Sequence, residues 1–259
     1  MTAELEKMSN FAATLADISG PIVCEHFRTR LNVHSKSDLS PVTIVDRNVE
    51  VALRKRIEET FPHHGIIGEE YGPVREDASH IWVLDPIDGT KAFISGLPIF
   101  GTLIALAIDG QPVVGVIDQP VLGERWVGVK GYGAHFNEKP IQTRDCRQLA
   151  DAALYATHPN MFDQGVDEDK FDGLAKIVGQ ARFGGDCYTY GLLASGHIDL
   201  VVEAKLQFYD FMALIPVVEG AGGVISDWQG NSLGRGSDGH VLAAANEKLW
   251  DLALNYLRA

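Results

Sequence analysis

Apolar residues recur every three or four positions in two stretches near the start of the chain, the spacing of helices with one buried face. The first stretch contains Leu5, Met8, Phe11, Leu15 and Ile18. We expect Pro21 to kink or end this helix, because proline lacks the N–H of a regular helical bond. The second stretch contains Val49, Ala52, Leu53 and Ile57, and closes at Phe61-Pro62. Between them, the polar, proline-containing segment 36–42 is typical of a mobile loop.

Short apolar runs then replace the helical spacing. They predict strands over residues 81–84, 100–108, 113–117 and 125–129. Asp109-Gly110 between two of these runs has the composition of a two-residue hairpin turn. The pattern therefore predicts an antiparallel meander that ends near Lys139-Pro140.

After Arg144 strands and helices alternate. Strands are predicted near 153–156, 198–202, 223–226 and 241–244, and helices near 168–179, 187–195, 211–221 and 247–257. This alternation is typical of α/β architecture. The sequence thus predicts an α+β N-terminal half, residues 1–145, with an antiparallel sheet, and an α/β C-terminal half, residues 146–259.

Composition and charge limit the possible functions. The 259 residues are 46% hydrophobic and 22% charged, the balance of an ordinary globular protein. The 35 acidic and 22 basic residues give a net charge of −13, which disfavours nucleic-acid binding and suits divalent cations or cationic small molecules. Three widely spaced cysteines form no disulfide framework, and we see neither a signal peptide nor a membrane span. We therefore expect a cytoplasmic protein.

The strongest local signal is the segment 81–91, IWVLDPIDGTK, in which an apolar strand leads into two carboxylates. We expect Pro86 to stop the strand after Asp85, and Asp88 to cap a short helix. Asp85, Asp88 and the carbonyl of Ile87 can then face one point. The backbone N–H groups of Gly89, Thr90 and Lys91 at the helix start favour an anion. A hard cation beside a phosphate is what a metal-assisted phosphatase requires.

Further acidic residues lie at similar junctions, and each has a simpler explanation. Glu69 and Glu70 follow the apolar pair Ile66-Ile67, and Glu70 is alternatively only a solvated neighbour of Glu69. Asp46 lies three residues after Thr43 and alternatively closes a capping box. Asp210 precedes an apolar helix, and its alternative role is an N-cap. His63 and His64 follow a helix end and are expected in a solvated turn with no site role.

Three segments together resemble the inositol monophosphatase family of magnesium-dependent, lithium-sensitive phosphatases: GEE at 68–70, DPIDGT at 85–90, and YD…EGAGG at 209–223. They occur in the family's order and spacing. The resemblance implies a layered α-β-α-β-α sandwich, a homodimer, and a small-molecule phosphate monoester as substrate. Tyr209 stands where the family usually has tryptophan, which affects packing more than chemistry.

The same resemblance implies the roles of the site residues. Glu69, Asp85 and the Ile87 carbonyl hold a first Mg²⁺, and Asp85, Asp88 and Asp210 hold a second. Asp46 reaches a weaker third ion through water. Thr90, paired with Glu69 or Asp46, orients the attacking water, and the N–H groups of Gly89, Thr90 and Lys91 bind the phosphate. The loop around 36–40 is expected to close over this site.

Simple electrostatics agrees with that assignment. Two bare carboxylates ~4 Å apart repel by ~4 kcal/mol at an effective dielectric constant of ~20, so converging acids need cations. Because every proposed ligand is oxygen, magnesium suits the site better than zinc. We expect two or three Mg²⁺ per active site.

The segment 182–204 resembles the histidinol-phosphatase branch of the family more than the inositol-specific one. In that interpretation Asp186 and Glu203 bind the amino group and imidazole of L-histidinol phosphate, and Arg182 and Gly185 flank the organic part. The alternative for Asp186 is a cap on the helix that starts at Cys187. Two other functions stay open: an inositol-1-phosphate or broad polyol monophosphate phosphatase, and a non-catalytic, metal-binding regulatory relative.

Overall fold

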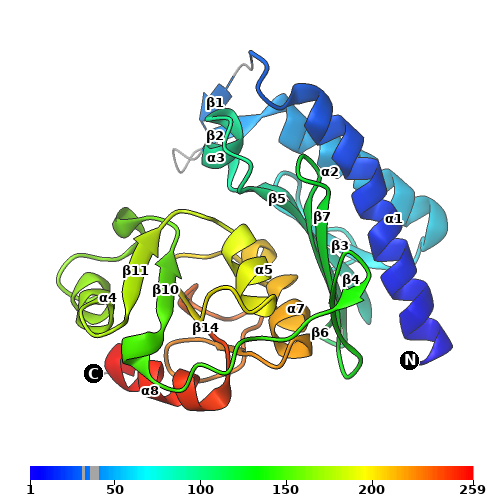
Figure 1. Cartoon of the computed structure of the whole chain (residues 1–259). Helices are drawn as coiled ribbons and strands as arrows, with labels where there is room; N and C mark the ends of the chain where they lie inside the picture. The colour runs from blue at the N-terminus through cyan, green and yellow to red at the C-terminus, as the bar shows by residue number, and fades with distance from the viewer. Residues whose placement is uncertain (31–32, 36–40, 259) are drawn as a thin grey trace.

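The computed structural model describes residues 1–30, 33–35 and 41–258, which form five layers of alternating helices and sheets (Figure 1). The predicted α-β-α-β-α sandwich is thus confirmed. Within the described residues, no helix combines the length and apolar character needed to cross a membrane. The segment 36–40, which we expected to close over the site, lies outside the described residues.

The first layer consists of the two predicted amphipathic helices, α1 (Ala3–His26) and α2 (Ile44–Thr60). Their apolar faces pack on one side of the larger sheet, where Leu15, Val49 and Trp82 are fully buried. The expectation for Pro21 was wrong in one respect, because α1 continues through it to His26. Val23, beyond the proline, is fully buried, so packing outweighs the lost backbone bond.

The larger sheet has seven strands in the order β3-β4-β5-β6-β7-β8-β9. They are β3 (Gly65–Gly68), β4 (His80–Asp88), β5 (Gly101–Ile108), β6 (Gln111–Gln119), β7 (Glu124–Val129), β8 (Gly133–Phe136) and β9 (Lys139–Pro140). All neighbours are antiparallel except β3 and β4, so the predicted meander is confirmed from β4 onward. Asp109 and Gly110 form the expected hairpin turn, with φ of 49° and 78°. A separate pair, β1 (Val33–Ser35) and β2 (Pro41–Thr43), precedes α2.

The smaller sheet has the strand order β11-β10-β12-β14-β13. Its strands are β10 (Ala153–Ala156), β11 (Gln180–Phe183), β12 (Leu200–Glu203), β13 (Val224–Ser226) and β14 (Val241–Ala244). β10 is parallel to β11 and β12, and β14 is antiparallel to β12 and β13. The helices α4 (Asp167–Ala175) and α8 (Glu247–Arg258) cover its outer face, and two short 3₁₀ turns lie at Leu149–Asp151 and Pro159–Met161.

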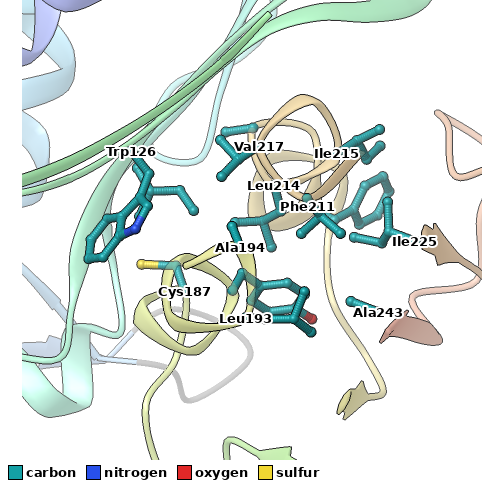
Figure 2. Packing of buried hydrophobic residues seen from close by; sticks show 14 of the residues in the cluster. Trp126, Cys187, Leu193, Ala194, Phe211, Leu214, Ile215, Val217, Ile225 and Ala243 are labelled. Carbon is teal, nitrogen blue, oxygen red and sulfur yellow. The ribbon is translucent and has the colours of Figure 1, made fainter. Parts of the chain in front are cut away.

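The central layer lies between the two sheets and contains α5 (Tyr188–Ala194), α6 (Phe208–Phe211) and α7 (Leu214–Gly220). Figure 2 shows Trp126 of the larger sheet facing this layer, in one buried cluster with Leu193, Leu214 and Val217. Two strand glycines allow close approach: a Cβ on Gly115 or Gly128 would lie 2.1 Å from the carbonyl oxygen of Ala213 or Pro216. These two contacts hold α6 and α7 against the sheet that contains the segment 81–91 with Asp85 and Asp88.

Several element boundaries differ from the predictions. The predicted helix 211–221 is two helices, α6 and α7, and the predicted helix 168–179 ends at Ala175. The strands β1, β2, β3 and β11 were not predicted, and β2 includes Pro41 and Val42 from the segment 36–42 that we expected to be a loop. β3 is short and β11 is entirely exposed, so neither has a strong apolar pattern. The larger sheet ends at Pro140 and the smaller begins at Ala153, while the central core is shared by both halves. The division at residue 145 stays a prediction.

Candidate active site

Glu69 and Asp85 lie side by side because each comes directly after one member of a residue pair on two parallel strands. Gly68 of β3 pairs with Leu84 of β4, and the Glu69 N–H donates to the Leu84 carbonyl at 3.2 Å. The next residue on each strand is therefore an acid, and the Asp85 side chain hydrogen-bonds Glu69. Asp85 is 2% exposed. Two carboxylates 16 positions apart in sequence thus form one side of the site.

The segment after Asp85 bulges, and does not end the strand as we expected. β4 runs through Pro86 to Asp88, with a register shift between Asp85 and Asp88 where the proline interrupts the pairing. The Ile87 N–H donates to Asp85 Oδ1 at 3.0 Å. The bulge brings Asp88 to the same edge of the sheet, where its Oδ2 accepts the Cys187 N–H at 2.7 Å.

The short helix α3 (Thr90–Ile94) follows directly, and its cap differs from the prediction. Its N-cap is Gly89, with φ 83°, and no side chain caps it, so Asp88 is not the N-cap. A left-handed φ is easily adopted only by glycine. The Asp88 carboxylate consequently remains directed at the other acids and at Cys187 rather than at the helix.

Thr90 contacts Asp46, which lies 44 positions earlier in α2. The Thr90 hydroxyl lies 3.1 Å from the Ile87 carbonyl and 3.5 Å from Asp46 Oδ1. The capping box predicted as the alternative for Asp46 is present, with Asp46 Oδ2 accepting the Thr43 N–H at 2.9 Å and its hydroxyl at 2.5 Å. Asp46 therefore uses one oxygen for the helix cap and turns the other toward Thr90.

Asp210 reaches the site from the C-terminal half. It is the third residue of α6, not an N-cap; its Oδ2 accepts the Gln207 N–H at 2.7 Å in a capping box. One carboxylate oxygen from each of Asp85, Asp88 and Asp210 lies within 4.8 Å of the other two. The structure thus brings together acids separated by 125 positions in sequence.

This crowding raises the affinity of the carboxylates for protons. Burial, and then the charges of Glu69 and Asp88, raise the pKa of Asp85 well above its usual range. Burial, followed by the charge of Asp210, raises the pKa of Asp88 to about 8. Burial likewise raises the pKa of Asp210 to about 7. The metal-free cluster is therefore electrostatically unfavourable in its ionised form.

The donor set fits a hard divalent cation. Each oxygen ligand lies about 2.0–2.1 Å from Mg²⁺. One oxygen from each of the three carboxylates lies within 4.8 Å of the others, so a small shift would let all three reach one ion. No cysteine or histidine belongs to this group of three. Burial and then mutual repulsion raise these pKa values, and a nearby cation would stabilise the ionised carboxylates.

A cavity of about 90 Å³ opens beside the cluster and is also lined with acids. Asp88 and Asp210 form part of its wall, and Asp186 and Glu203 form another part. Glu203 ends β12 and is 2% exposed; it accepts the Thr157 N–H at 3.0 Å and the Tyr190 hydroxyl at 2.9 Å, and also bonds the Thr157 hydroxyl. Burial raises the pKa of Glu203.

Asp186 enters this cavity because its side chain does not cap α5. The N-cap of α5 is Cys187 with no side-chain cap, and Asp186 bonds Thr189 through its backbone carbonyl only, so the capping alternative was wrong. Its φ of 45° is left-handed, and a Cβ on Gly89 would lie 2.9 Å from its Cβ and Cγ. Burial, followed by the charge of Asp88, raises the pKa of Asp186 to about 8.

The other three residues predicted to bind the substrate or phosphate, Gly185, Arg182 and Lys91, are not among the residues that line this cavity. Gly185 is buried at φ 131°, where a Cβ would lie 2.2 Å from Thr189 Cγ2. Arg182 lies on the exposed strand β11, apart from the residues that line the cavity. Lys91 is exposed on α3, and its charge lowers the pKa of Asp186, though by less than burial raises it.

Sequence reasoning missed Thr157, Tyr190 and Glu50. Thr157 directly follows β10, which is parallel to β12, so register places it beside Glu203. A polar residue immediately after a parallel strand is the signal that could have identified it. Tyr190 and Glu50 lie on buried helix faces, where no local pattern distinguishes them.

Nearly the whole chain is similar to known proteins of one family. Residues 4–258 match the model of the inositol monophosphatase family. The chain is 47% identical over 229 residues to the bifunctional phosphatase IMPL2 of Arabidopsis thaliana, covering 88% of this chain but only 66% of that protein. It is 35% identical to a histidinol-phosphatase of Chlorobaculum parvum, covering 96% and 94% of the two chains.

A solved structure is similar over the full length of both chains. It is an inositol monophosphatase from Zymomonas mobilis, 47% identical, with a TM-score of 0.92. The fold and the site together define a phosphatase that acts on small phosphate monoesters. The chain belongs to the inositol monophosphatase family.

Proposed function

We propose that this protein is a Mg²⁺-dependent phosphomonoesterase that hydrolyses L-histidinol phosphate to L-histidinol and phosphate. The observation that carries the substrate assignment is the second acidic wall of the cavity, formed by Asp186 and Glu203. An alcohol with an ammonium group and an imidazole is complementary to such a wall. The similarity to histidinol-phosphatases of three bacteria, at 33–35% identity, supports the same substrate.

Glu69, Asp85 and the Ile87 carbonyl would hold the first Mg²⁺, and Asp85, Asp88 and Asp210 the second. Asp46 would reach a third through water. Bound Mg²⁺ lowers the pKa of its water and neutralises charge on the phosphate. The fit of the oxygen donors, which are buried or half-buried and repel one another without a cation, supports this assignment.

The remaining chemistry belongs to the chain itself. The hydroxyl of Thr90, close to Asp46 Oδ1 and the Ile87 carbonyl, orients the attacking water together with Glu69 or Asp46. The N–H groups of Gly89, Thr90 and Lys91 start α3 and have no partners within that helix. They bind the phosphate oxygens and keep the phosphorus in line with the water.

Asp186 and Glu203 orient the organic part of the substrate. Glu203 is fixed by Thr157 and Tyr190, so its carboxylate is held ready for a donor. The pKa of Asp186 falls when a cation binds beside it, and the ionised form then pairs with the substrate ammonium. Charge pairing of this kind discriminates against a neutral polyol.

Inositol phosphate is the second candidate, favoured by the 47% identity to an inositol monophosphatase of Zymomonas mobilis. Steady-state hydrolysis of L-histidinol phosphate and myo-inositol 1-phosphate, side by side with Mg²⁺, separates the two. We expect kcat/KM to be about 10- to 100-fold larger for L-histidinol phosphate, since a lost charged contact costs roughly 1.5–3 kcal/mol. A larger kcat/KM for the inositol ester rejects the histidinol assignment.

A non-catalytic regulatory relative would usually lack one of the acids or Thr90, and this chain retains all of them. Phosphate release that stops with EDTA and returns with Mg²⁺ excludes that alternative. We also propose a homodimer, as in relatives of this family, and a cytoplasmic location, since all three cysteines are free. Light scattering and cell fractionation test these two points.

A further inference from the structure

Glu50 is a buried acid that bonds the backbone next to Glu69. It belongs to α2, one turn after Asp46, and is 0% exposed. Its Oε2 accepts the Glu70 N–H at 2.7 Å, and its Oε1 accepts the Tyr71 N–H at 3.3 Å. Glu50 therefore bonds the backbone of both residues that directly follow Glu69.

Arg54, one further turn along α2, completes this arrangement. Its Nε donates to Glu50 Oε1 at 2.7 Å, and its NH2 group donates to the Tyr71 carbonyl at 2.8 Å. Glu50 and Arg54 together thus bind both backbone groups of Tyr71. The Arg54 side chain is only 12% exposed, so solvent screens this pair weakly.

Gly68 shows how closely the Glu50 carboxylate approaches the turn. A Cβ at this position would lie 2.1 Å from Glu50 Oε1 and 2.4 Å from its Cδ. Only glycine leaves room for the carboxylate directly beneath the backbone. On the other side of the turn, the Glu69 N–H donates to the Leu84 carbonyl. The backbone of Glu69 is consequently fixed on both sides.

We infer that Glu50 is a positioning residue for the metal site, which holds the turn 68–71 so that the Glu69 carboxylate points at Asp85. This inference rests on the proposed role of Glu69 as a metal ligand. A buried carboxylate that serves only stability would not need to bind the two residues after a ligand. Groups that orient metal ligands typically change metal affinity by 10- to 100-fold when they are altered.

The test measures metal binding without substrate. Mn²⁺ binding is followed by electron paramagnetic resonance, with Mg²⁺ as competitor, in the wild type, Glu50→Gln and Glu69→Gln. Glutamine keeps one acceptor oxygen but places an NH₂ group against an N–H donor, so the turn loses its anchor. We expect Glu50→Gln to weaken binding about 10-fold and to raise the Mg²⁺ concentration needed for half-maximal activity equally. The kcat at saturating Mg²⁺ should change less than threefold.

Asp199→Asn is the matched control. Asp199 is also fully buried, bonded to an arginine (Arg144) and to a backbone N–H (Ala153, 2.8 Å). It precedes β12, at the opposite end of that strand from Glu203. Asp199→Asn should lower the Tm without changing metal affinity. Arg54→Lys, a milder change that leaves Glu50 in place, should weaken metal binding two- to fivefold.

These variants distinguish the positioning role of Glu50 from the proposed role of Glu69 as a metal ligand. If Glu69→Gln binds metal as tightly as the wild type, the proposed metal site itself is wrong. If Glu69→Gln weakens binding but Glu50→Gln and Arg54→Lys both change it less than twofold, Glu50 serves only stability. If Glu50→Gln does not fold, the Arg54→Lys titration alone decides between these results.

Discussion

The backbone N–H of Cys187 donates a 2.7 Å hydrogen bond to Asp88 Oδ2, across 99 positions of sequence. Asp88 ends a strand of the larger sheet, and Cys187 caps a helix of the central layer. The bond connects the three-carboxylate cluster to the segment that carries Asp186. The proposed phosphate-binding and alcohol-binding parts of the site are therefore joined directly.

Asp186→Asn tests recognition of the cationic substrate. We expect kcat/KM for L-histidinol phosphate to fall about 100-fold, because a charged hydrogen bond is worth roughly 1.5–3 kcal/mol. For the neutral ester glycerol 2-phosphate the loss should be below about threefold. The two substrates are compared by steady-state kinetics at saturating Mg²⁺. Equal losses for both would mean that Asp186 has only a structural role.

Asp210→Asn should leave the metal-free protein as stable as the wild type or more so, and should reduce the stabilisation that Mg²⁺ provides. Burial raises the pKa of Asp210 to about 7, so its ionised form destabilises the metal-free fold at pH 8. Without Mg²⁺ the variant should therefore melt at the same or a higher temperature than the wild type. Its Mg²⁺-induced increase in Tm should shrink, since each tenfold loss of affinity removes about 1.4 kcal/mol of linked stabilisation.

Thermal melts with EDTA and with Mg²⁺ provide this measurement. Asp251→Asn, an exposed acid on α8, is the control and should change neither melt. An Asp210→Asn protein that gains as much stability from Mg²⁺ as the wild type contradicts the proposed ligand set.

Gly89→Ala tests the close approach between the phosphate-binding turn and Asp186. A left-handed alanine costs roughly 1–2 kcal/mol, and its Cβ would lie 2.9 Å from Asp186 Cβ. Gly110→Ala has the same backbone cost, with φ 78°, but its Cβ meets open space in the hairpin turn. Both should lower the free energy of unfolding, as measured by urea denaturation, and Gly89→Ala should lower it more because of its contact with Asp186.

Only Gly89→Ala should also lower kcat/KM, by at least about tenfold, because it moves groups that contact the substrate. A Gly110→Ala protein with an equal loss of activity would show that the effect comes from general destabilisation.

His64 predicts a pH dependence of stability. We expected it in a solvated turn, but its ring stacks on Phe61 and His80 and its Nδ1 accepts the Trp82 indole N–H at 3.1 Å. Burial, and then the charge of His80, lowers the pKa of His64 to about 4. The unfolded chain takes up a proton near pH 6.5, and the folded chain does not until about pH 4. The free energy of unfolding should therefore fall as the pH falls from 6.5 to 4.

His64→Asn removes this titration but keeps an acceptor for Trp82. Urea denaturation of both proteins between pH 4.5 and 7.5 should give a shallower slope for the variant below pH 6.5. Parallel curves would show that His64 is protonated equally in the folded and unfolded chains.

Local patterns in the sequence were sufficient for much of this protein. The spacing of apolar residues determined α1 and α2, Asp109-Gly110 determined a hairpin, and Thr43 with Asp46 determined a helix cap. The segment 85–90, with two acids three positions apart, likewise indicated the acidic site. All of these depend on interactions between residues a few positions apart, which a pattern records directly.

The tertiary structure alone decided which distant groups meet. The register of parallel strands placed Glu69 beside Asp85, and packing of α6 on the larger sheet brought Asp210 to Asp88. Packing also carried α1 through Pro21, and it placed Glu50 under Gly68. These outcomes depend on the free energy of burying whole faces of helices and sheets against one another, which no local stretch of sequence contains.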